Sequence, residues 1–302
     1  MIDKIDYFGS PKEDHIEKIS RGPKYISAGW ENILKDPPKN SSSQTRRELR
    51  ELSKLTRSLS DKDRDLVFSV DGAPEDIFIE YLNKNDLTFP EKIIEGLYTD
   101  SLEPIVYALK WKYKRARPFQ LSGALDIPVS VINTSTARTP AYPSGHTAYG
   151  YFVYNVLSYF YPEHKQSFSD LAYQVGHARM LQGAHYKSDN TAGAKLADFV
   201  WKDLIKNPIV KEVIMPLKKC SDNNNSGWKW GDQGKCYTGP EGKKKAIKQG
   251  IVIEGPEKFR EKACLLQESF SQQEISEVVD DLHSLGYDNV SIANVVLSLK
   301  NK

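Results

Sequence analysis

The chain has almost no net charge, which excludes the partners that a strong overall field would attract. Its 302 residues include 42 basic and 40 acidic side chains. These nearly cancel, so neither nucleic acid nor an anionic membrane surface is favoured, and any partner must be recognised locally. Hydrophobic residues make up 39% of the chain, enough for the core of one large domain with a smaller one.

Long apolar runs are also missing. No segment reaches the roughly 18 consecutive apolar residues of a membrane-spanning helix, and the nearest, residues 149–161, is interrupted by Asn155 and Ser158. The start of the chain, residues 1–7, carries two acids and no apolar run behind them, unlike a signal peptide. We therefore expect a soluble, cytoplasmic protein without integral membrane association.

Cysteine is scarce. Cys220, Cys236 and Cys264 all lie in the last third of the chain, at spacings that match no zinc site, and no histidine is close by. We expect free thiols in a reducing compartment.

Strand signals are rare, and before residue 207 only residues 127–132 show a β-like run. The predicted fold class is all-α: a helical bundle over residues 1–207, in which residues 1–40 form an N-terminal arm. Apolar periodicity predicts its helices at residues 42–59, from Pro74, at 90–118 with a break at Pro104, and at 147–160, 168–181 and 191–205.

The composition changes after residue 207. Residues 208–227 are expected to be a linker, because they end in the polar run Asp222–Gly227. Residues 228–302 predict a small C-terminal α+β module, made of an aromatic hairpin at 228–237 and two short helices after a capping-box pattern at Ser271. Lysines 243, 244, 245 and 248 are interpreted as solvated charges, so the expected partner of this module is a protein and not nucleic acid.

The stretch Tyr142–Thr147, with the sequence YPSGHT, lies where a polar loop leads into an apolar helical segment. Free backbone N–H groups and the helix dipole make such a junction an anion site. Ser144 adds a hydroxyl, Gly145 permits close approach, and His146 adds a titratable group. Taken alone, the stretch is equally compatible with an ordinary helix cap.

Two further polar groups lie beside apolar helical segments: Lys110 with Arg117, and Arg179 with His185 and Asp189. Singly, Lys110 and Arg117 are compatible with exposed helix charges, like the neighbouring Lys112, Lys114 and Arg115. Arg179 alone is compatible with a cation paired to an acid in the bundle, and His185 with Asp189 is compatible with a local i, i+4 pair. Together, the three cations and the amides of residues 144 and 145 supply what a phosphate dianion needs on its non-reacting oxygens.

Two histidines then remain for the chemistry. Asp189 can accept a hydrogen bond from one ring nitrogen of His185, which fixes the tautomer and leaves the other nitrogen as nucleophile. His146 is then the acid that protonates the leaving oxygen, and afterwards the base.

These residues carry a family resemblance. Lys110-x6-Arg117-Pro118, Pro143–His146 and Arg179-x5-His185-x3-Asp189 resemble the three-part signature of the superfamily that contains bacterial class A non-specific acid phosphatases, vanadium-dependent haloperoxidases and type 2 phosphatidic acid phosphatases. The surrounding residues are most similar to the class A branch, and the resemblance covers roughly residues 90–205. It implies an all-helical fold, a phosphohistidine on His185, acid–base work by His146, and no metal or other cofactor, with vanadate as an inhibitor.

The chain departs from the pattern at Ala178, where the family usually has serine, and in lacking an export signal. Residues 227–250 are similar to a short module of tailed-phage proteins, which suggests a viral gene and a location in the host cytoplasm or the virion.

We therefore predict a soluble, metal-independent phosphomonoesterase that acts on a small phosphorylated substrate. Two alternatives stay open. One is a haloperoxidase with vanadate as prosthetic group, and the other is a phage structural or interaction protein with a vestigial phosphate site. The oligomeric state is not specified.

Overall fold

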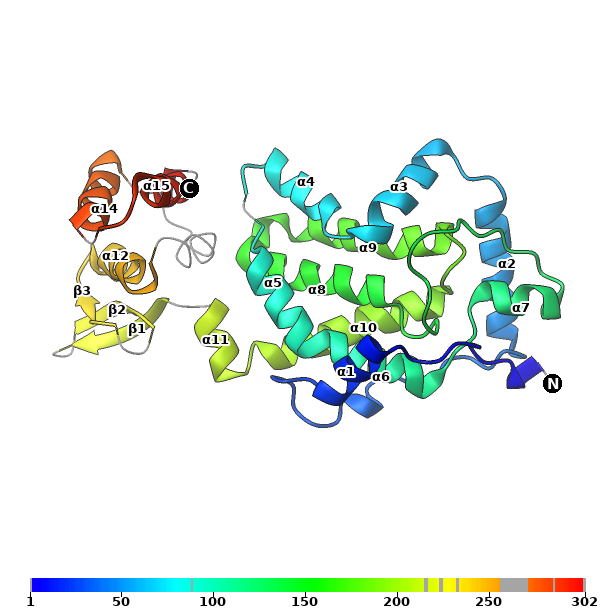
Figure 1. Cartoon of the computed structure of the whole chain (residues 1–302). Helices are drawn as coiled ribbons and strands as arrows, with labels where there is room; N and C mark the ends of the chain where they lie inside the picture. Colours follow the sequence, from blue (N-terminus) through cyan, green and yellow to red (C-terminus); the bar gives the residue numbers. More distant parts are fainter. Residues whose placement is uncertain are drawn as a thin grey trace. The chain divides into compact units, whose positions relative to one another are not determined.

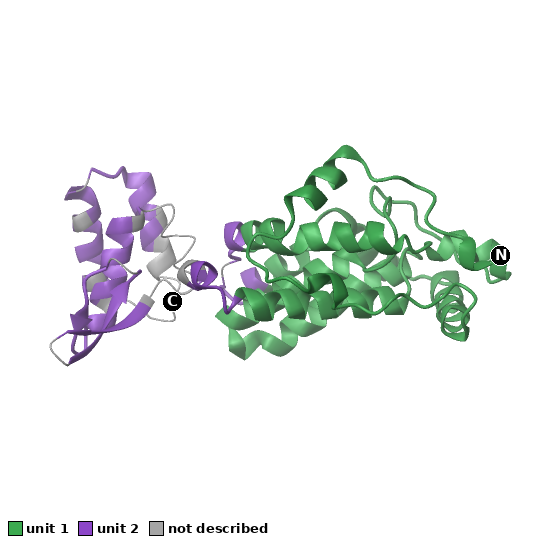
Figure 2. Ribbon diagram, turned by 90° about the horizontal axis from the view of Figure 1, so that it is seen from below, with its two compact units in different colours: residues 1–81, 94–204 green, residues 82–93, 205–302 purple. Residues whose placement is uncertain are grey.

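The computed structural model describes residues 2–87, 89–214, 217–222, 225–231, 234–255, 271–284 and 286–300. The chain forms two compact units, one of residues 1–81 and 94–204 and the other of residues 82–93 and 205–302 (Figure 2).

The first unit is built from helices, so the all-α prediction is confirmed (Figure 1). In chain order its elements are η1 (Ile2–Lys4), α1 (Glu13–Arg21), η2 (Trp30–Asn32), α2 (Ser43–Arg57), α3 (Asp61–Gly72), α4 (Asp76–Lys84), α5 (Glu91–Leu97), η3 (Tyr98–Leu102), α6 (Glu103–Tyr113), α7 (Pro118–Leu125), α8 (Gly145–Phe160), η4 (Pro162–His164), α9 (Lys165–Leu181) and α10 (Lys187–Leu204). Helices α4 and α5 extend across the unit boundaries.

Helix α8 is the central helix of this unit, with α9 and α10 packed against it. All three turn apolar faces inward, and residues such as Phe152, Val175 and Leu196 are fully buried. Apolar burial contributes about 25 cal/mol per Å², so this packing is the main force that holds α8 between α9 and α10.

A glycine lets α10 approach the start of α8 closely. A Cβ atom added at Gly193 would lie 2.5 Å from the carbonyl oxygen of Ser144. Carbon and oxygen cannot approach so closely, so any side chain at this position would push the two helices apart. The close packing brings residues 144–147 beside the first turn of α10.

Most of the predicted helices are present, and the break expected at Pro104 is real. A π-helical turn, η3, separates α5 from α6, and Pro104 lies in the first turn of α6. Helix α3 was not predicted. The β-like run at residues 127–132 forms no strand, in agreement with the all-α prediction; its Ser130 N–H donates to the Thr56 hydroxyl and its Ile132 N–H to the Gln182 carbonyl.

The second unit contains a three-stranded antiparallel sheet of β1 (Leu217–Asp222), β2 (Asn225–Trp230) and β3 (Tyr237–Thr238), in that order. Its helices are α11 (Pro208–Ile214), α12 (Gly242–Glu254), α14 (Gln272–Ser284) and α15 (Asn289–Lys300). Trp230 packs with aliphatic residues of the last three helices to form a separate core. The predicted small α+β appendage is therefore confirmed.

The expected linker and hairpin are wrong in position. Residues 208–227 hold α11, β1 and the start of β2, and the hairpin joins β1 to β2, with Leu217 opposite Trp230 and Asp222 opposite Asn225. The polar run that we interpreted as a linker therefore contains paired residues of both strands, Asp222 of β1 and Asn225 to Gly227 of β2.

The expectation of free thiols is also wrong for two cysteines, because Cys220 and Cys236 form a disulfide. Gly227 lies opposite Cys220 in the sheet, and a Cβ atom there would be 3.1 Å from the Cys236 sulfur. The missing side chain thus leaves room for the bridge over β2. Cys264 lies outside the described residues, and the thiol argument for a reducing compartment no longer holds.

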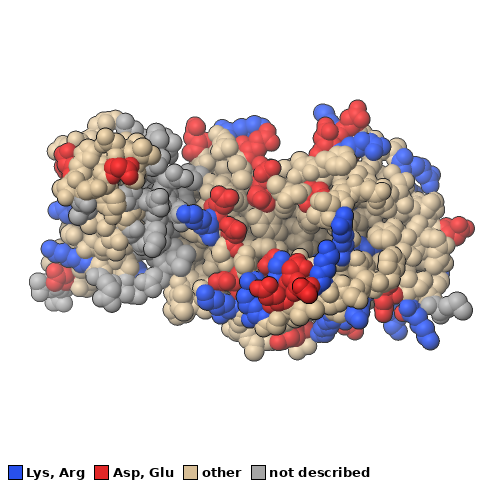
Figure 3. All heavy atoms as spheres, viewed as in Figure 1, with Lys and Arg blue, Asp and Glu red and all other residues tan. Residues whose placement is uncertain are grey.

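Helix hydropathy and surface charge both agree with what the sequence predicts. No helix in the described parts of the chain has the length and apolar character needed to cross a bilayer. On the face drawn in Figure 3, acidic and basic side chains are interspersed, as the near balance of charges predicts.

Candidate active site

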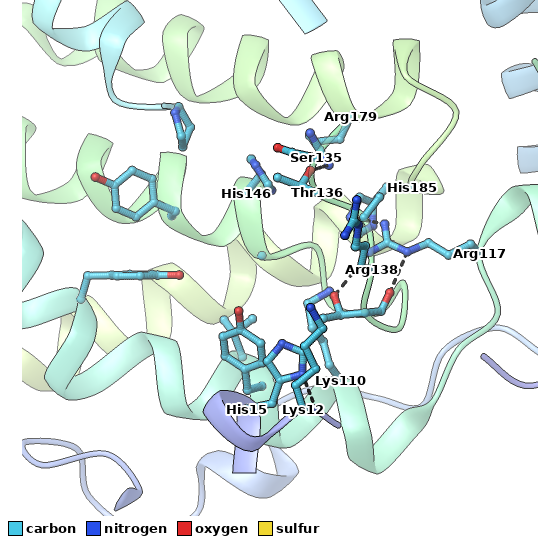
Figure 4. Close-up of a pocket in the computed structure, with 18 of the residues that line it drawn as sticks. Lys12, His15, Lys110, Arg117, Ser135, Thr136, Arg138, His146, Arg179 and His185 are labelled. Carbon is cyan, nitrogen blue, oxygen red and sulfur yellow. Dashed lines mark hydrogen bonds between the residues drawn. The ribbon is translucent and has the colours of Figure 1, made fainter. Parts of the chain in front are cut away.

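The first unit contains a pocket of about 510 Å³, a volume that accommodates a small organic ligand. Its base is lined by Lys110, Arg117, His146, Arg179 and His185, which converge from α6, α8, α9 and the adjoining loops (Figure 4). Its mouth is aromatic and basic, with Lys12, His15, Tyr98, Tyr107, Arg138 and Tyr149. Six of the eight predicted site residues, these five and Gly145, therefore line one pocket.

His185, just before α10, is held by a partner on each ring nitrogen. Its Nδ1 is 3.3 Å from Oδ2 of Asp189, which can only accept, so Nδ1 carries the proton. Its Nε2 is 2.9 Å from NH1 of Arg117, which can only donate, so Nε2 presents its lone pair. Burial, together with the charges of Arg117 and Lys110, lowers the pKa of His185 well below its usual value. The imidazole is neutral and has the tautomer that a nucleophile requires.

A second buried layer holds Asp189. Arg115 NH1 lies 2.5 Å from Oδ1 of Asp189, and its other terminal nitrogen is 3.6 Å from Glu48. The Arg115 guanidinium lies over the ring of Tyr186, 4.1 Å from its centroid. Arg115 is 3% exposed, although we grouped it with solvated helix charges. It orients the carboxylate that orients His185.

Lys110 and Arg117 are buried cations whose partners are neutral oxygens. Lys110 donates to the Pro140 carbonyl at 2.7 Å, and Arg117 donates to the carbonyls of Thr139 and Ala184 at 2.8 and 2.9 Å. Burial and then the charge of Arg117 lower the pKa of Lys110. Burial and then the charge of Arg179 lower the pKa of Arg117 to about 10. Both cations would be stabilised by an anion in the pocket.

Arg179, in α9, is anchored from behind by Asp71, the penultimate residue of α3. Its NH1 donates to Oδ1 of Asp71 at 2.7 Å and its NH2 to the hydroxyl of Thr136 at 2.7 Å. Its Nε is buried and has no hydrogen-bond partner among the described residues. Burial raises the pKa of Asp71, but Arg179 and the hydroxyls of Thr134 and Thr136 outweigh it and lower that pKa. Asp71 was not predicted as part of the site.

His146, in the first turn of α8, faces the pocket from the opposite side to Lys110 (Figure 4). Its Nε2 lies 3.0 Å from the Asp71 carbonyl, which accepts, so Nε2 carries the proton and Nδ1 is left for a ligand. Burial and then the Arg179 charge lower the pKa of His146 to about 3. The histidine is therefore neutral in the empty pocket.

Ser144 is not placed as we expected. Its hydroxyl accepts the Thr147 N–H and so caps α8, and its own N–H donates to the Asp189 carbonyl at 3.0 Å. Both groups are thus engaged away from the pocket, and Ser144 joins α8 to α10 in place of the predicted phosphate contact. Gly145, the first residue of α8, does line the pocket, where helix-terminal N–H groups are available.

The residues of this pocket lie mostly in a part of the chain that matches a known family. Residues 97–202 match the model of the PAP2 superfamily. This part of the chain is a PAP2 superfamily domain. All eight predicted site residues lie within it, whereas Asp71 precedes it.

Curated relatives support the class A acid phosphatase branch. The non-specific acid phosphatase of Providencia stuartii is 29% identical over 162 residues, which cover 52% of this chain and 63% of the relative. The one from Salmonella typhimurium is 29% identical over 145 residues, with coverages of 48% and 58%. That of Salmonella typhi is 32% identical over 114 residues, with coverages of 37% and 45%. The chain thus spans less than two thirds of the length of these relatives.

Proposed function

We propose that this protein hydrolyses phosphomonoesters through a phosphohistidine on His185, without a metal ion. The observation that carries the proposal is the tautomer of His185, whose Nε2 lone pair faces Lys110, Arg117 and Arg179 in a pocket of fixed positive charge. The names of the relatives and the family match support the same reaction class.

Phosphate binding comes first. The three cations and the N–H of Gly145 hold the non-reacting oxygens, as electrostatic stabilisation of a phosphoryl group requires. In the proposed binding step, the arriving phosphate takes the Arg117 NH1 group from Nε2 of His185, with which it makes a 2.9 Å contact in the structure. The lone pair is then free to react.

Transfer follows in two steps. Nε2 of His185 forms a bond to phosphorus while the bond to the leaving oxygen breaks, and Nδ1–H of His146 gives its proton to that oxygen. Water then loses a proton to Nδ1 of His146 and attacks phosphorus, the P–N bond breaks, and inorganic phosphate leaves. Because the pKa of His146 is about 3 in the empty pocket, the dianionic substrate must raise it, and substrate binding brings in the proton.

The decisive experiment is hydrolysis of p-nitrophenyl phosphate in EDTA, with trapping of an acid-labile phosphoenzyme. We expect turnover, competitive inhibition by vanadate, and loss of both turnover and trapping in His185→Ala. His177→Ala is the matched control, because His177 belongs to the same unit but lines a different pocket, and it should keep both. Full turnover in His185→Ala would falsify the assignment of the nucleophile, and loss of activity in EDTA would remove metal independence.

A further inference from the structure

Asp71 contacts three parts of the pocket from a helix outside the PAP2 domain. Its carboxylate accepts hydrogen bonds from Arg179 at 2.7 Å, from the hydroxyl of Thr134 at 2.6 Å and from that of Ser135 at 3.0 Å. The hydroxyl of Thr136 is a fourth donor. Its main-chain carbonyl accepts from His146.

This set of partners excludes a direct chemical role for the carboxylate. Three donors, from Arg179, Thr134 and Thr136, converge on its Oδ1, and Ser135 donates to its Oδ2, so both oxygens are engaged by protein groups. Asp71 is also 6% exposed and does not line the pocket. Any effect of its side chain on a ligand must therefore pass through the groups that it holds.

The first of these groups is Arg179. The bond to Asp71 and the bond to Thr136 fix the two ends of the guanidinium, and Thr136 in turn donates to Asp71. The ring of contacts sets the plane of the guanidinium and leaves its buried Nε for another acceptor. A planar donor held in this way recognises a tetrahedral oxyanion with little loss of entropy.

The second group is His146. Because the Asp71 carbonyl takes the Nε2 proton, the ring presents Nδ1 to the pocket. Helix α3 therefore orients both a phosphate-binding cation and the acid–base residue.

We propose that Asp71 is a positioning residue of the phosphate site, which holds Arg179 and the hydroxyls of residues 134–136 in the geometry that binds a phosphoryl transition state. The inference rests on the proposed function. It adds a residue that acts through Arg179 and that precedes residues 97–202, the part of the chain that matches the PAP2 superfamily.

The test compares Asp71→Asn with the wild type in the binding of vanadate and of inorganic phosphate, measured by calorimetry and as inhibition constants. Asparagine keeps the shape but removes the negative charge, so the ion pair that anchors Arg179 is lost and Ser135 no longer meets an acceptor oxygen. We expect affinity for vanadate, which resembles the transition state, to fall tenfold or more, and affinity for phosphate to fall less. Asp65→Asn is the control, because Asp65 is an exposed residue of the same helix.

A double-mutant cycle tells positioning from general damage. If Asp71 acts through Arg179, then adding Asp71→Asn to Arg179→Met should change vanadate affinity less than threefold. Thr136→Val is a milder second variant, which removes the bridging hydroxyl, and it should weaken vanadate binding in the same direction if Asp71→Asn does not fold.

The outcomes separate this inference from the proposed function. A wild-type protein that binds neither anion and hydrolyses no phosphoester refutes the proposed function. A wild type that binds vanadate, with folded Asp71→Asn and Thr136→Val variants that bind it within twofold as tightly, refutes only the role of Asp71. An undiminished effect of Asp71→Asn in the Arg179→Met background refutes the route through Arg179.

Discussion

Replacing Arg115 with methionine should destabilise the helical unit by about 3 kcal/mol. Arg115 is 3% exposed, and its partner Asp189, 2.5 Å away, is fully buried. Removing one member of a buried ion pair costs roughly 3–5 kcal/mol, because the remaining charge stays desolvated. We take the lower end, since Asp189 keeps its hydrogen bonds from His185 and from the Tyr186 N–H.

The measurement is urea unfolding followed by far-ultraviolet circular dichroism, with Lys202→Met as the control. Lys202 is paired with Asp198 at 2.6 Å, but its side chain is 65% exposed. An exposed pair contributes only about 0–1 kcal/mol. Both substitutions remove one positive charge from the same unit, so the same transition is compared and only burial differs.

Equal losses in the two variants, both below about 1 kcal/mol, would refute the reasoning, since Asp189 would then be stabilised without Arg115. Arg115→Lys should lie between the wild type and Arg115→Met in its free energy of unfolding. Lysine keeps the charge but lacks the planar fork that reaches Asp189 with one terminal nitrogen and Glu48 with the other, so we expect a smaller loss than with methionine.

Three further predictions concern other parts of the chain. Ser144→Ala should cost about 1 kcal/mol of stability through the lost helix cap, yet leave KM within about threefold, because the backbone bond to α10 remains; a tenfold rise in KM would restore the predicted phosphate contact. His146 should make the free energy of unfolding fall as pH decreases from about 6.5 toward 3, by up to about 1.4 kcal/mol per pH unit, because the unfolded chain takes up a proton that the folded chain takes up only near pH 3; His146→Gln should lower the slope by this amount in urea titrations, and the contribution of His185 should remain. Reduction of the Cys220–Cys236 bridge, which spans 16 residues, should destabilise the second unit by about 3 kcal/mol without changing turnover, because the site lies in the first unit; identical melting curves before and after reduction would contradict this.

Helix α3 shows why part of the fold could not be predicted. The central helices α8, α9 and α10 follow apolar periodicity, because their inward faces are continuous. In α3 the pattern is inverted at two positions: Phe68 is 59% exposed and Asp71 is buried. Hydropathy assigns each to the wrong side, and only the partners of Asp71, distant in sequence, explain its burial. Residues that break the pattern for the sake of the site are the ones that periodicity misses.

The same reasoning applies to Arg115. The motif identifies Arg117, and the charges around it look alike in sequence. The backbone separates them: Lys114, with φ of 46°, ends α6, and the extended chain that follows places residues 115 and 117 on the same side. Both arginines therefore point inward. An extended segment after a helix end, with arginine at alternate positions, is the signal that would have identified Arg115 as part of the site.

The cations in and around the pocket differ in whether a carboxylate is bonded to them, and this difference determines how strongly each would attract an anion. Arg179 is neutralised from behind by Asp71, and Arg115 by Asp189 and Glu48. In the part of the chain that the structure describes, Lys110 and Arg117 bond only to carbonyl, hydroxyl and imidazole groups, and the more distant charge of Asp189 offsets their burial only in part. The lowered pKa values of both express that cost, and a bound dianion relieves it. If the pocket binds a phosphoryl group as we propose, Lys110 and Arg117 would supply most of the attraction, whereas Arg179, already paired with Asp71, would supply mainly direction.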